Sequence, residues 1–408
     1  MLRKLFGPST LITAAFIGPG TVTVCTLAGV RSGYTLLWAL LFSMLATVIL
    51  QEMTGRLGLV TQKGFGEAIR LVVSQPLARA LSIILVLGAI VVGNAAYEGG
   101  NISGAVLGLE ELTLPLSFTL GSVKVSLAPA LIGIIAWQVL RSSRFQVIER
   151  ALVILVLVMS AVFVTTALLV QPDLSALAAG LLVPRASAGE WLQVMALLGT
   201  TVVPYNLFLH AAVVQERYKT ASEMPMLRLE LLVAVLIGGV ISMSIVVTSA
   251  ATLYGNETIA SAADMAVQLE PLLGSWAPAF LGLGLFAAGI SSAITAPLAA
   301  AFAARGILGW DVDRQSRRFR LVWQLILLLG VLVSSFGLNP VLIIQFAQVA
   351  NGILLPVIAV FLVTMVNQKS LLGGYTNSAW QNALAVGVII IALALGLRTI
   401  NNVLQVIG

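Results

Sequence analysis

Phe16-Ile17-Gly18-Pro19-Gly20-Thr21 breaks an otherwise apolar segment near the N-terminus of this chain. Proline removes a backbone hydrogen-bond donor and glycine is conformationally free, so a helix does not continue comfortably through this run. In lipid, backbone freed in this way is tolerated only where protein buries it or where it lines a water-filled cavity. The stretch therefore predicts a broken membrane helix with a ligand site at the break. The alternative is a kink without a ligand.

The composition indicates a membrane protein. Of the 408 residues, 59% are hydrophobic and 9% are charged, and the mean hydropathy is +1.04. A soluble domain carries about 25% charged residues. The net charge of +6 does not indicate nucleic acid, because the basic residues fall in short loops between apolar segments. The single cysteine excludes an internal disulfide, and no cleavable signal peptide is expected.

Eleven apolar segments are long enough, at about 20 residues each, to cross the hydrocarbon layer. Their expected spans are 9–30, 34–55, 77–107, 122–140, 147–170, 190–214, 229–254, 277–303, 320–337, 340–366 and 382–404. The chain is therefore expected to be an all-α polytopic membrane protein.

The loop charges give an expected orientation. When the loops are assigned alternately to the two sides, 18 of the 22 Lys and Arg residues fall on the side of the N-terminus. Arg31, Lys124, Arg185 and Arg398 fall on the other side. This bias predicts a multi-pass protein of the inner (plasma) membrane, with a cytoplasmic N-terminus and an extracytoplasmic C-terminus.

Nearly all acidic residues lie in loops or at helix ends, and Glu98 is the exception. It lies near the middle of the third segment, and Asn101 follows on the same helix face. A carboxyl group at that depth is costly and typically marks an ion or proton route. The alternative is a protonated glutamic acid that hydrogen bonds to a neighbouring helix.

A second break lies in the sixth segment, at Thr200-Thr201-Val202-Val203-Pro204-Tyr205. The two breaks are five segments apart. Transporters built from two inverted repeats place broken helices at corresponding positions, with the substrate site between them near the midplane. The spacing predicts a first repeat over 1–170, a second over 171–366, and an eleventh helix and C-terminus over 367–408.

Several motifs resemble the NRAMP family of metal-ion transporters, which has the LeuT-type fold. The matching stretches are Gly33-Tyr34-Thr35-Leu36-Leu37-Trp38, Leu57-Gly58-Leu59-Val60-Thr61, the sixth segment through Pro204, Asn206 and His210, and Ala288-Gly289-Ile290-Ser291-Ser292-Ala293-Ile294-Thr295. The resemblance covers residues 5–366 and implies two inverted five-helix repeats, with helices one and six broken.

The chain departs from the family pattern at the breaks. The family has Asp-Pro-Gly-Asn at the first break and Met-Pro-His at the second, whereas this chain has Gly18-Pro19-Gly20-Thr21 and Val203-Pro204-Tyr205. A thioether selects transition metals, so its loss removes that selection. The remaining oxygen donors suit magnesium, which usually keeps several waters. This pattern resembles the NRAMP-related magnesium transporter branch, which takes up divalent cations without evident proton coupling.

The resemblance implies a set of metal-site residues: Gly18, Thr21, Glu98, Asn101, Thr200, Val203, Tyr205 and Gln348. Gln348 resembles a family glutamine that approaches the metal, although it and Asn351 equally suit a bridge between helices. His210, the sole histidine, is interpreted as a packing residue, although the resemblance also associates its position with proton movement. Ser291 and Ser292 are interpreted as small interface residues, with lining of the ion path as the alternative.

The expected function is import of divalent metal ions, Mg²⁺ first and Mn²⁺ also, by alternating access without obligatory proton coupling. Two alternatives remain, a proton-coupled Mn²⁺ or Fe²⁺ importer and an amino-acid or amine transporter on the same fold. No enzyme activity, resident cofactor or nucleic-acid partner is expected. The expected partners are the cation itself, as cargo, and the lipid bilayer; the oligomeric state stays open.

Overall fold

The computed structural model describes residues 17–113, 116–120, 123–142, 145–256, 259–310 and 316–407. Within these ranges the chain is almost entirely helical, as predicted. The first half of the first expected segment, 9–16, lies outside the described residues.

Each of the eleven expected segments corresponds to a helix or a helix pair in the described chain. They are α3 (Pro19–Ser32), α4 (Leu37–Thr61), α6 (Pro76–Leu112), α7 (Ala128–Arg141), α8 (Phe145–Leu169), the pair α10 (Trp191–Thr201) and α11 (Pro204–Arg217), α12 (Met224–Leu253), α15 (Ala277–Leu308), α16 (Arg317–Ser335), α17 (Pro340–Val366) and α19 (Ala379–Ile407). Within the described ranges, nine spans are long and apolar enough to cross a membrane, while α7 is a shorter apolar helix.

Short elements join these helices. They are α5 (Phe65–Val72), α9 (Leu174–Leu182), α13 (Ala262–Ala266), α14 (Glu270–Leu273), α18 (Lys369–Leu372), the 3-10 turns η1 (Ala188–Glu190), η2 (Ala221–Glu223), η3 (Val267–Leu269), η4 (Gly274–Trp276) and η5 (Gly373–Tyr375), and the strands β1 (Ser117–Leu120) and β2 (Val123–Ser126).

The hairpin corrects the expected start of the fourth segment at residue 122. β1 and β2 pair antiparallel, with Ser117 opposite Ser126, and α7 begins only at Ala128. The stretch Val123-Lys124-Val125-Ser126 alternates apolar and polar residues with the period of a strand. Pro129, in the first turn of α7, favours a helix start at that point.

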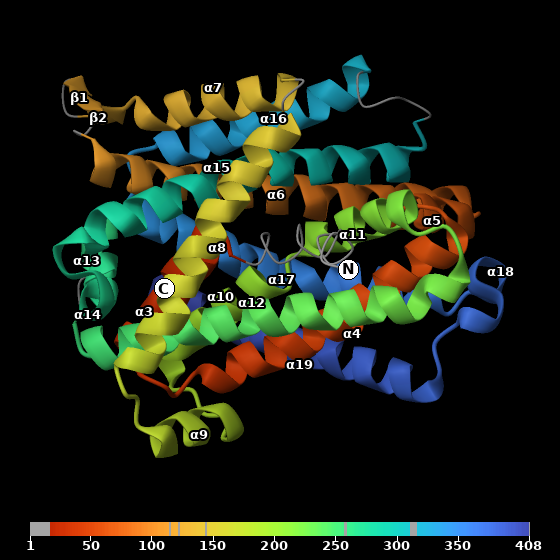
Figure 1. Ribbon diagram of the computed structural model, residues 1–408. Helices are drawn as coiled ribbons and strands as arrows, with labels where there is room; N and C mark the ends of the chain where they lie inside the picture. Colours follow the sequence, from red (N-terminus) through yellow and green to blue (C-terminus); the bar gives the residue numbers. More distant parts are fainter. Residues whose placement is uncertain are drawn as a thin grey trace.

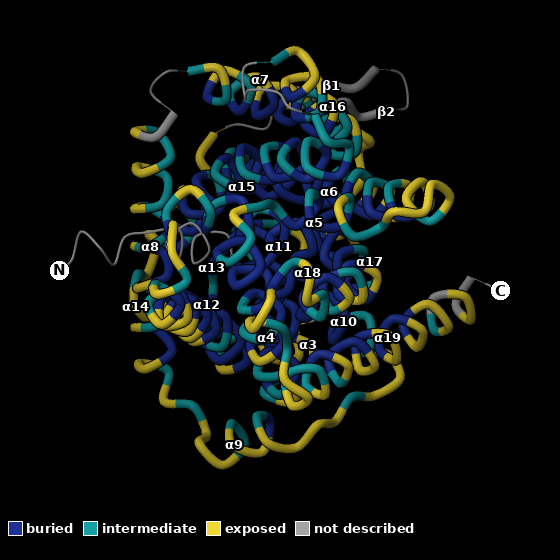
Figure 2. Tube along the Cα trace, turned by 90° about the vertical axis from the view of Figure 1, so that its right-hand side faces the viewer, coloured by how far each residue is buried: buried dark blue, intermediate teal, exposed yellow. Residues whose placement is uncertain are grey.

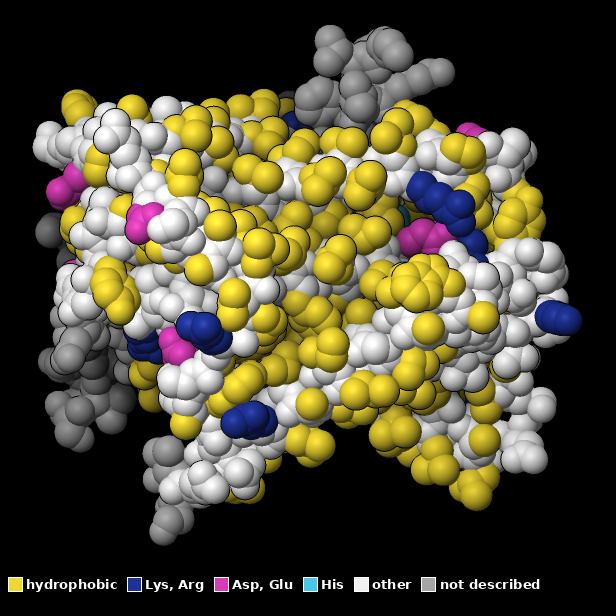
Figure 3. All heavy atoms as spheres, turned by 90° about the horizontal axis from the view of Figure 1, so that it is seen from below, with side chains coloured by type: hydrophobic (Ala, Val, Ile, Leu, Met, Phe, Trp, Pro, Cys, Tyr) yellow, Lys and Arg dark blue, Asp and Glu magenta, His cyan; other side chains and the backbone are white. Residues whose placement is uncertain are grey.

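The C-terminal half of the long helix α6, from Gly93 to Gly108, lies in the interior of the bundle, and the helix packs against α15, α16 and α17. Figure 1 shows α7 and α16 along one edge of the molecule and α4 and α19 toward the opposite edge. Buried residues gather in the middle, whereas α9 and the outer turns of α19 are mostly exposed (Figure 2). On the face in Figure 3, charged side chains lie toward the two ends and hydrophobic side chains cover the band between them, as expected for a membrane-spanning bundle.

The predicted break in the sixth segment is present, and a helix begins at the predicted first break, where the residues before Ile17 lie outside the described chain. α3 begins at Pro19, and Gly18 before it has extended backbone with φ −88° and ψ 174°. α10 ends at Thr201 and α11 begins at Pro204, with Val203 extended at φ −81° and ψ 123°. In each case proline starts the new helix, where its missing N–H group costs no hydrogen bond. Backbone groups at two helix ends are thereby left inside the bundle.

Candidate functional site

Two threonine hydroxyl groups meet where the broken helices approach each other. Thr21 Oγ1 of α3 lies 3.0 Å from Thr200 Oγ1 of α10, and both residues are buried. One residue comes from the first turn of a half-helix and the other from the last turn of a different half-helix. The sequence predicted both positions, and the structure brings them into direct contact across 179 residues of chain.

The first break is closely surrounded by α6 and α15. A Cβ atom placed on Gly18 would lie 3.2 Å from Ser292 Oγ and 3.7 Å from Tyr97 OH. Ser292 was expected to serve as a small interface residue, and its hydroxyl instead faces the break. Tyr97 was missed by the sequence reasoning, although it lies one turn before Asn101 on the same face of α6.

The second break contributes Val203 and Tyr205. The Tyr205 ring meets the Tyr97 ring edge to face, with ring centroids 5.2 Å apart and an interplanar angle of 63°. Val203 joins the two tyrosines in a small buried cluster, which Ala296 and Ala299 of α15 complete. The two breaks therefore share the Tyr97 side chain as a common wall.

Gln348 of α17 packs against both helix breaks. A Cβ atom on Gly20 would collide with the Gln348 side-chain amide, and a Cβ atom on Gly199 would collide with the Gln348 backbone carbonyl. The Gln348 Oε1 atom is buried and has no hydrogen-bond partner among the described residues, and the same holds for Asn351 Nδ2 one turn further along α17. A buried amide oxygen without a donor is rare in folded proteins and is suited to a cation. We call Gly18, Thr21, Thr200, Tyr205 and Gln348 the break cluster.

Glu98 lies beside the break cluster and faces α16. A Cβ atom on Gly330 of α16 would collide with the Glu98 side chain. Asn101 donates from Nδ2 to Glu98 Oε2 over 3.3 Å, whereas Glu98 Oε1 has no partner within the described chain. Glu98 is also close enough to Tyr97 and Tyr205 for electrostatic interaction with both phenol groups. Glu98 and Asn101 therefore pair with each other, and their link to the breaks runs through the tyrosines.

Two further buried polar residues border this region. Asn94, one turn before Glu98 on α6, has no partner for either side-chain polar atom in the described structure. His210 of α11 hydrogen bonds to the backbone of Gln51 and lies against Gly55 of α4, while its Nδ1 atom has no partner. The packing contact with Gly55 agrees with the packing interpretation of His210.

In the part of the chain that the structure describes, no three His, Cys, Asp or Glu side chains lie together as a metal-binding group. The break cluster instead offers hydroxyl, amide and backbone oxygens around two helix ends. Such neutral oxygen donors suit a hard cation that keeps part of its water shell.

A family model described as natural resistance-associated macrophage protein-like (Nramp) matches residues 9–402. The chain belongs to the Nramp family. The resemblance seen in the sequence is thereby confirmed over almost the whole chain. A curated relative, the divalent metal cation transporter MntH of Pectobacterium carotovorum subsp. carotovorum (strain PC1), is 26% identical over 399 residues, covering 97% of this chain and 93% of the relative.

Solved structures support the LeuT-type fold expected for an Nramp protein. A manganese transporter of Eremococcus coleocola, solved with an aromatic bis-isothiourea substituted compound, superposes with a TM-score of 0.78 at 22% identity, covering 98% of this chain and 87% of that chain. MhsT in complex with L-phenylalanine superposes with a TM-score of 0.62 at 16% identity, covering 97% and 98% of the two chains. The family members are transporters, so the prediction that this chain is not an enzyme is confirmed.

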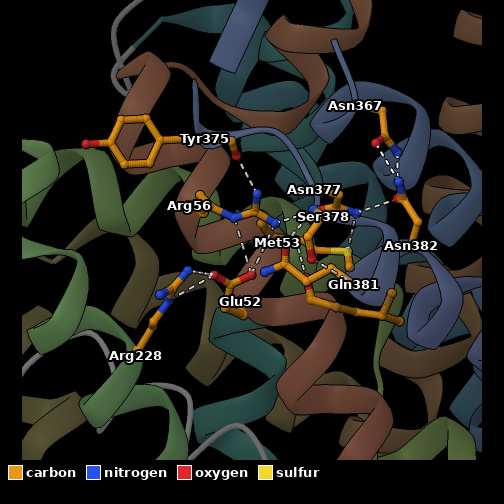
Figure 4. A network of polar contacts seen from close by, with 12 residues as sticks. Glu52, Met53, Arg56, Arg228, Asn367, Tyr375, Asn377, Ser378, Gln381 and Asn382 are labelled. Carbon is orange, nitrogen blue, oxygen red and sulfur yellow. Dashed lines mark hydrogen bonds and ion pairs between the residues drawn. The ribbon is translucent and has the colours of Figure 1, made fainter. Parts of the chain in front are cut away.

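A second polar cluster lies away from the breaks, at the end of the bundle that carries α5 and α18 (Figure 4). Arg56 of α4 is 2% exposed, forms an ion pair with Glu52 at 3.3 Å, and donates to the Tyr375 carbonyl and to Asn377 Oδ1. Glu52 in turn pairs with Arg228 of α12 at 2.7 Å. We call these five residues the end network.

Proposed function

We propose that this Nramp protein imports divalent metal ions by alternating access, with Mg²⁺ as the preferred ion, Mn²⁺ also accepted, and no obligatory proton coupling. The names of its relatives describe divalent metal cation and manganese transporters. The preference for Mg²⁺ rests on the chemistry of the break cluster, and the alternative of a proton-coupled Mn²⁺ or Fe²⁺ importer is a possible outcome of the test below.

The contact between Thr21 and Thr200 carries the proposal. It places two hydroxyl oxygens at the point where both broken helices end, beside the unpartnered Gln348 Oε1 atom. Position 18 is glycine and position 203 is valine, so neither break supplies a carboxylate or a thioether from these positions. Neutral oxygens favour an ion that dehydrates reluctantly, whereas tight binding of a transition metal favours softer ligands.

The surroundings of Glu98 support transport without protons. Its carboxyl group accepts a hydrogen bond from the neutral Asn101, and its Cβ and Cγ atoms pack against Gly330 of α16. The membrane potential supplies about 2.3 kcal/mol per elementary charge per 100 mV, and about twice that for a divalent ion. Uptake therefore has a driving force without coupling to another ion.

The proposed motion is a displacement of α3, α4, α10, α11 and α12 against α6, α7, α15 and α16. In this scheme the first repeat covers 1–170, the second 171–366, and 367–408 adds the eleventh helix. The end network would lie on the cytoplasmic side, because most loop Lys and Arg residues are at that end. The N-terminus would then be cytoplasmic and the C-terminus extracytoplasmic.

Flux into liposomes tests the proposal. Purified protein is reconstituted with a Mg²⁺ indicator or a pH indicator inside the vesicles, and a negative internal potential is imposed. We expect Mg²⁺ influx that rises with the potential and Mn²⁺ influx without acidification. Absence of Mg²⁺ flux together with Mn²⁺ flux that acidifies the lumen would show the proton-coupled alternative to be correct.

Glu98→Gln separates the roles of the carboxyl group. If Glu98 contributes a ligand or an electrostatic field to the ion, the variant will bind Mg²⁺ more weakly in a calorimetric titration. Asn101→Asp is the matched variant, because it adds a carboxyl group one turn away on the same helix. Unchanged Mg²⁺ binding in Glu98→Gln would remove Glu98 from the proposed site and leave the break cluster to hold the ion.

A further inference from the structure

A cavity of about 330 Å³ lies where α5, α11 and α15 meet, separate from the break cluster. Its described walls include two arginines, one glutamine and several aromatic rings: Arg70, Arg305, Gln215, Phe208, Phe302 and Trp310. None of these residues belongs to the candidate ion site or to the end network. The cavity therefore needs an explanation of its own.

The two arginines of this cavity have no anionic partner among the described residues. Arg70 Nε is buried without a hydrogen-bond partner, and the guanidinium group lies directly over Gly309. The Arg305 guanidinium carbon lies 5.6 Å from the centroid of the Phe302 ring. Within the described chain neither arginine forms an ion pair. Glu67, the acidic residue among the described wall residues, pairs with Lys63 at 3.7 Å.

Backbone donors of α5 add to the same wall. Gly64, Phe65 and Gly66 line the cavity at the start of this eight-residue helix, and Gly64 supplies no side-chain cap. The first N–H groups of a helix have no partner within the helix and favour a negative charge. These N–H groups favour an anionic ligand, as do Arg70 of α5 and Arg305 of α15.

We propose that this cavity binds a phosphate-bearing anion. Two guanidinium groups without an ion pair in the described chain disfavour a metal cation, and each matches the geometry of a phosphate through paired N–H donors. The volume lies within the range of small-molecule sites, and the aromatic walls suit a ligand with a flat or apolar part. Free phosphate, a nucleotide and a lipid headgroup share this chemistry.

Isothermal titration of the full chain in nanodiscs of phosphatidylcholine tests the proposal. The probes are inorganic phosphate, ATP with EDTA, and short-chain phosphatidylglycerol below its micelle concentration. We expect saturable binding of at least one probe, with one site per chain, and a loss of affinity of tenfold or more in Arg70→Gln and in Arg305→Gln. The probe that binds most tightly identifies the source of the phosphate group.

Arg398→Gln is the matched control. Arg398 also stacks on an aromatic ring, with its guanidinium carbon 4.4 Å from the Trp191 ring centroid, and its replacement changes the net charge by the same amount. It lies near the end of α19 and not on the cavity wall. Its loss should leave the affinity unchanged.

Gly64→Asp keeps the test valid if the arginine variants fold poorly. A Cβ atom on Gly64 meets no atom within 4 Å, and aspartate is a favourable N-cap residue. The variant should fold at least as well as the parent and should abolish anion binding, because its carboxylate occupies the start of α5. Binding of no probe, or binding that survives both Arg70→Gln and Gly64→Asp, would overturn the proposal.

Discussion

The break cluster and the end network each have a buried polar side chain at their centre, Gln348 and Arg56 respectively, yet the hydrogen bonding of these two side chains differs. In the end network, Arg56 is matched by a carboxylate, a backbone carbonyl and a side-chain amide. In the break cluster, Gln348 Oε1 has no partner within the part of the chain that the structure describes, and neighbouring Asn351 Nδ2 has none there either. A buried group that is satisfied by its own protein supports the fold, whereas an unsatisfied one is explained by a ligand or water. Under the proposed function, this contrast distinguishes a structural cluster from an ion site within one bundle.

The largest expected effect is on stability, in the end network. Arg56→Leu should lower the free energy of unfolding by about 3–5 kcal/mol, because it leaves the Tyr375 carbonyl and Asn377 without their buried donor. Arg228→Leu is the matched control. The Arg228 side chain is 51% exposed, so its loss should cost less than about 1 kcal/mol. Denaturant unfolding in detergent measures both, and equal losses would refute the structural role of Arg56.

The second prediction concerns the break cluster, where a substitution should reduce ion flux without reducing stability. Gln348→Leu removes an amide whose oxygen lacks a partner, so the stability should stay the same or rise by about 1–3 kcal/mol. Under the proposed function, Mg²⁺ flux into liposomes should nevertheless fall by tenfold or more. A destabilised variant with normal flux would assign Gln348 to the structural class instead.

Thr200→Val tests the other half of the cluster at nearly constant volume. It removes one of the two hydroxyl groups that meet at 3.0 Å, at a stability cost of about 1 kcal/mol for one lost hydrogen bond. We expect weaker Mg²⁺ binding in calorimetric titration. Thr201→Val is the control, because the Thr201 hydroxyl bonds to the Leu197 carbonyl within its own helix. Equal loss of Mg²⁺ binding in both variants would contradict a specific role for Thr200.

The membrane spans and the helix starts at the two prolines were predictable because their causes are local. Apolar length defines a span, and a proline in the middle of a span defines a break, so Pro19 and Pro204 indicated where α3 and α11 begin. The hairpin before α7 was missed because its second strand is a short alternating stretch next to an apolar segment, and periodicity alone does not separate the two.

Contacts between distant helices were not predictable from the sequence. The rotation of a helix about its axis decides which neighbour a side chain meets, and packing sets that rotation. Glu98 is predicted to line the ion site, and packing also sets its Cβ and Cγ atoms against Gly330 of α16, a contact that the sequence did not indicate. No sequence pattern indicated that the Tyr97 hydroxyl group would lie next to Gly18. The burial of Arg56 depends on Tyr375, which is 319 residues away.

The smallest expected effect concerns an exposed polar group that is satisfied locally. The Ser175 hydroxyl and the backbone N–H groups of Ser175 and Ala176 hold the pKa of Asp173 below its ordinary value of 3.8, at the start of α9. A carboxyl group with a lowered pKa stabilises the folded helix above pH 3.8, and this contribution is lost as the pH falls through the folded-state value. Asp173→Ala should therefore speed amide hydrogen exchange in α9 at pH 7 and leave Mg²⁺ flux unchanged. Ser175→Ala, which keeps the carboxylate and both backbone bonds, should show a smaller change. If Asp173→Ala reduced flux as strongly as Gln348→Leu, hydrogen-bond satisfaction would not distinguish structural residues from transport residues in this protein.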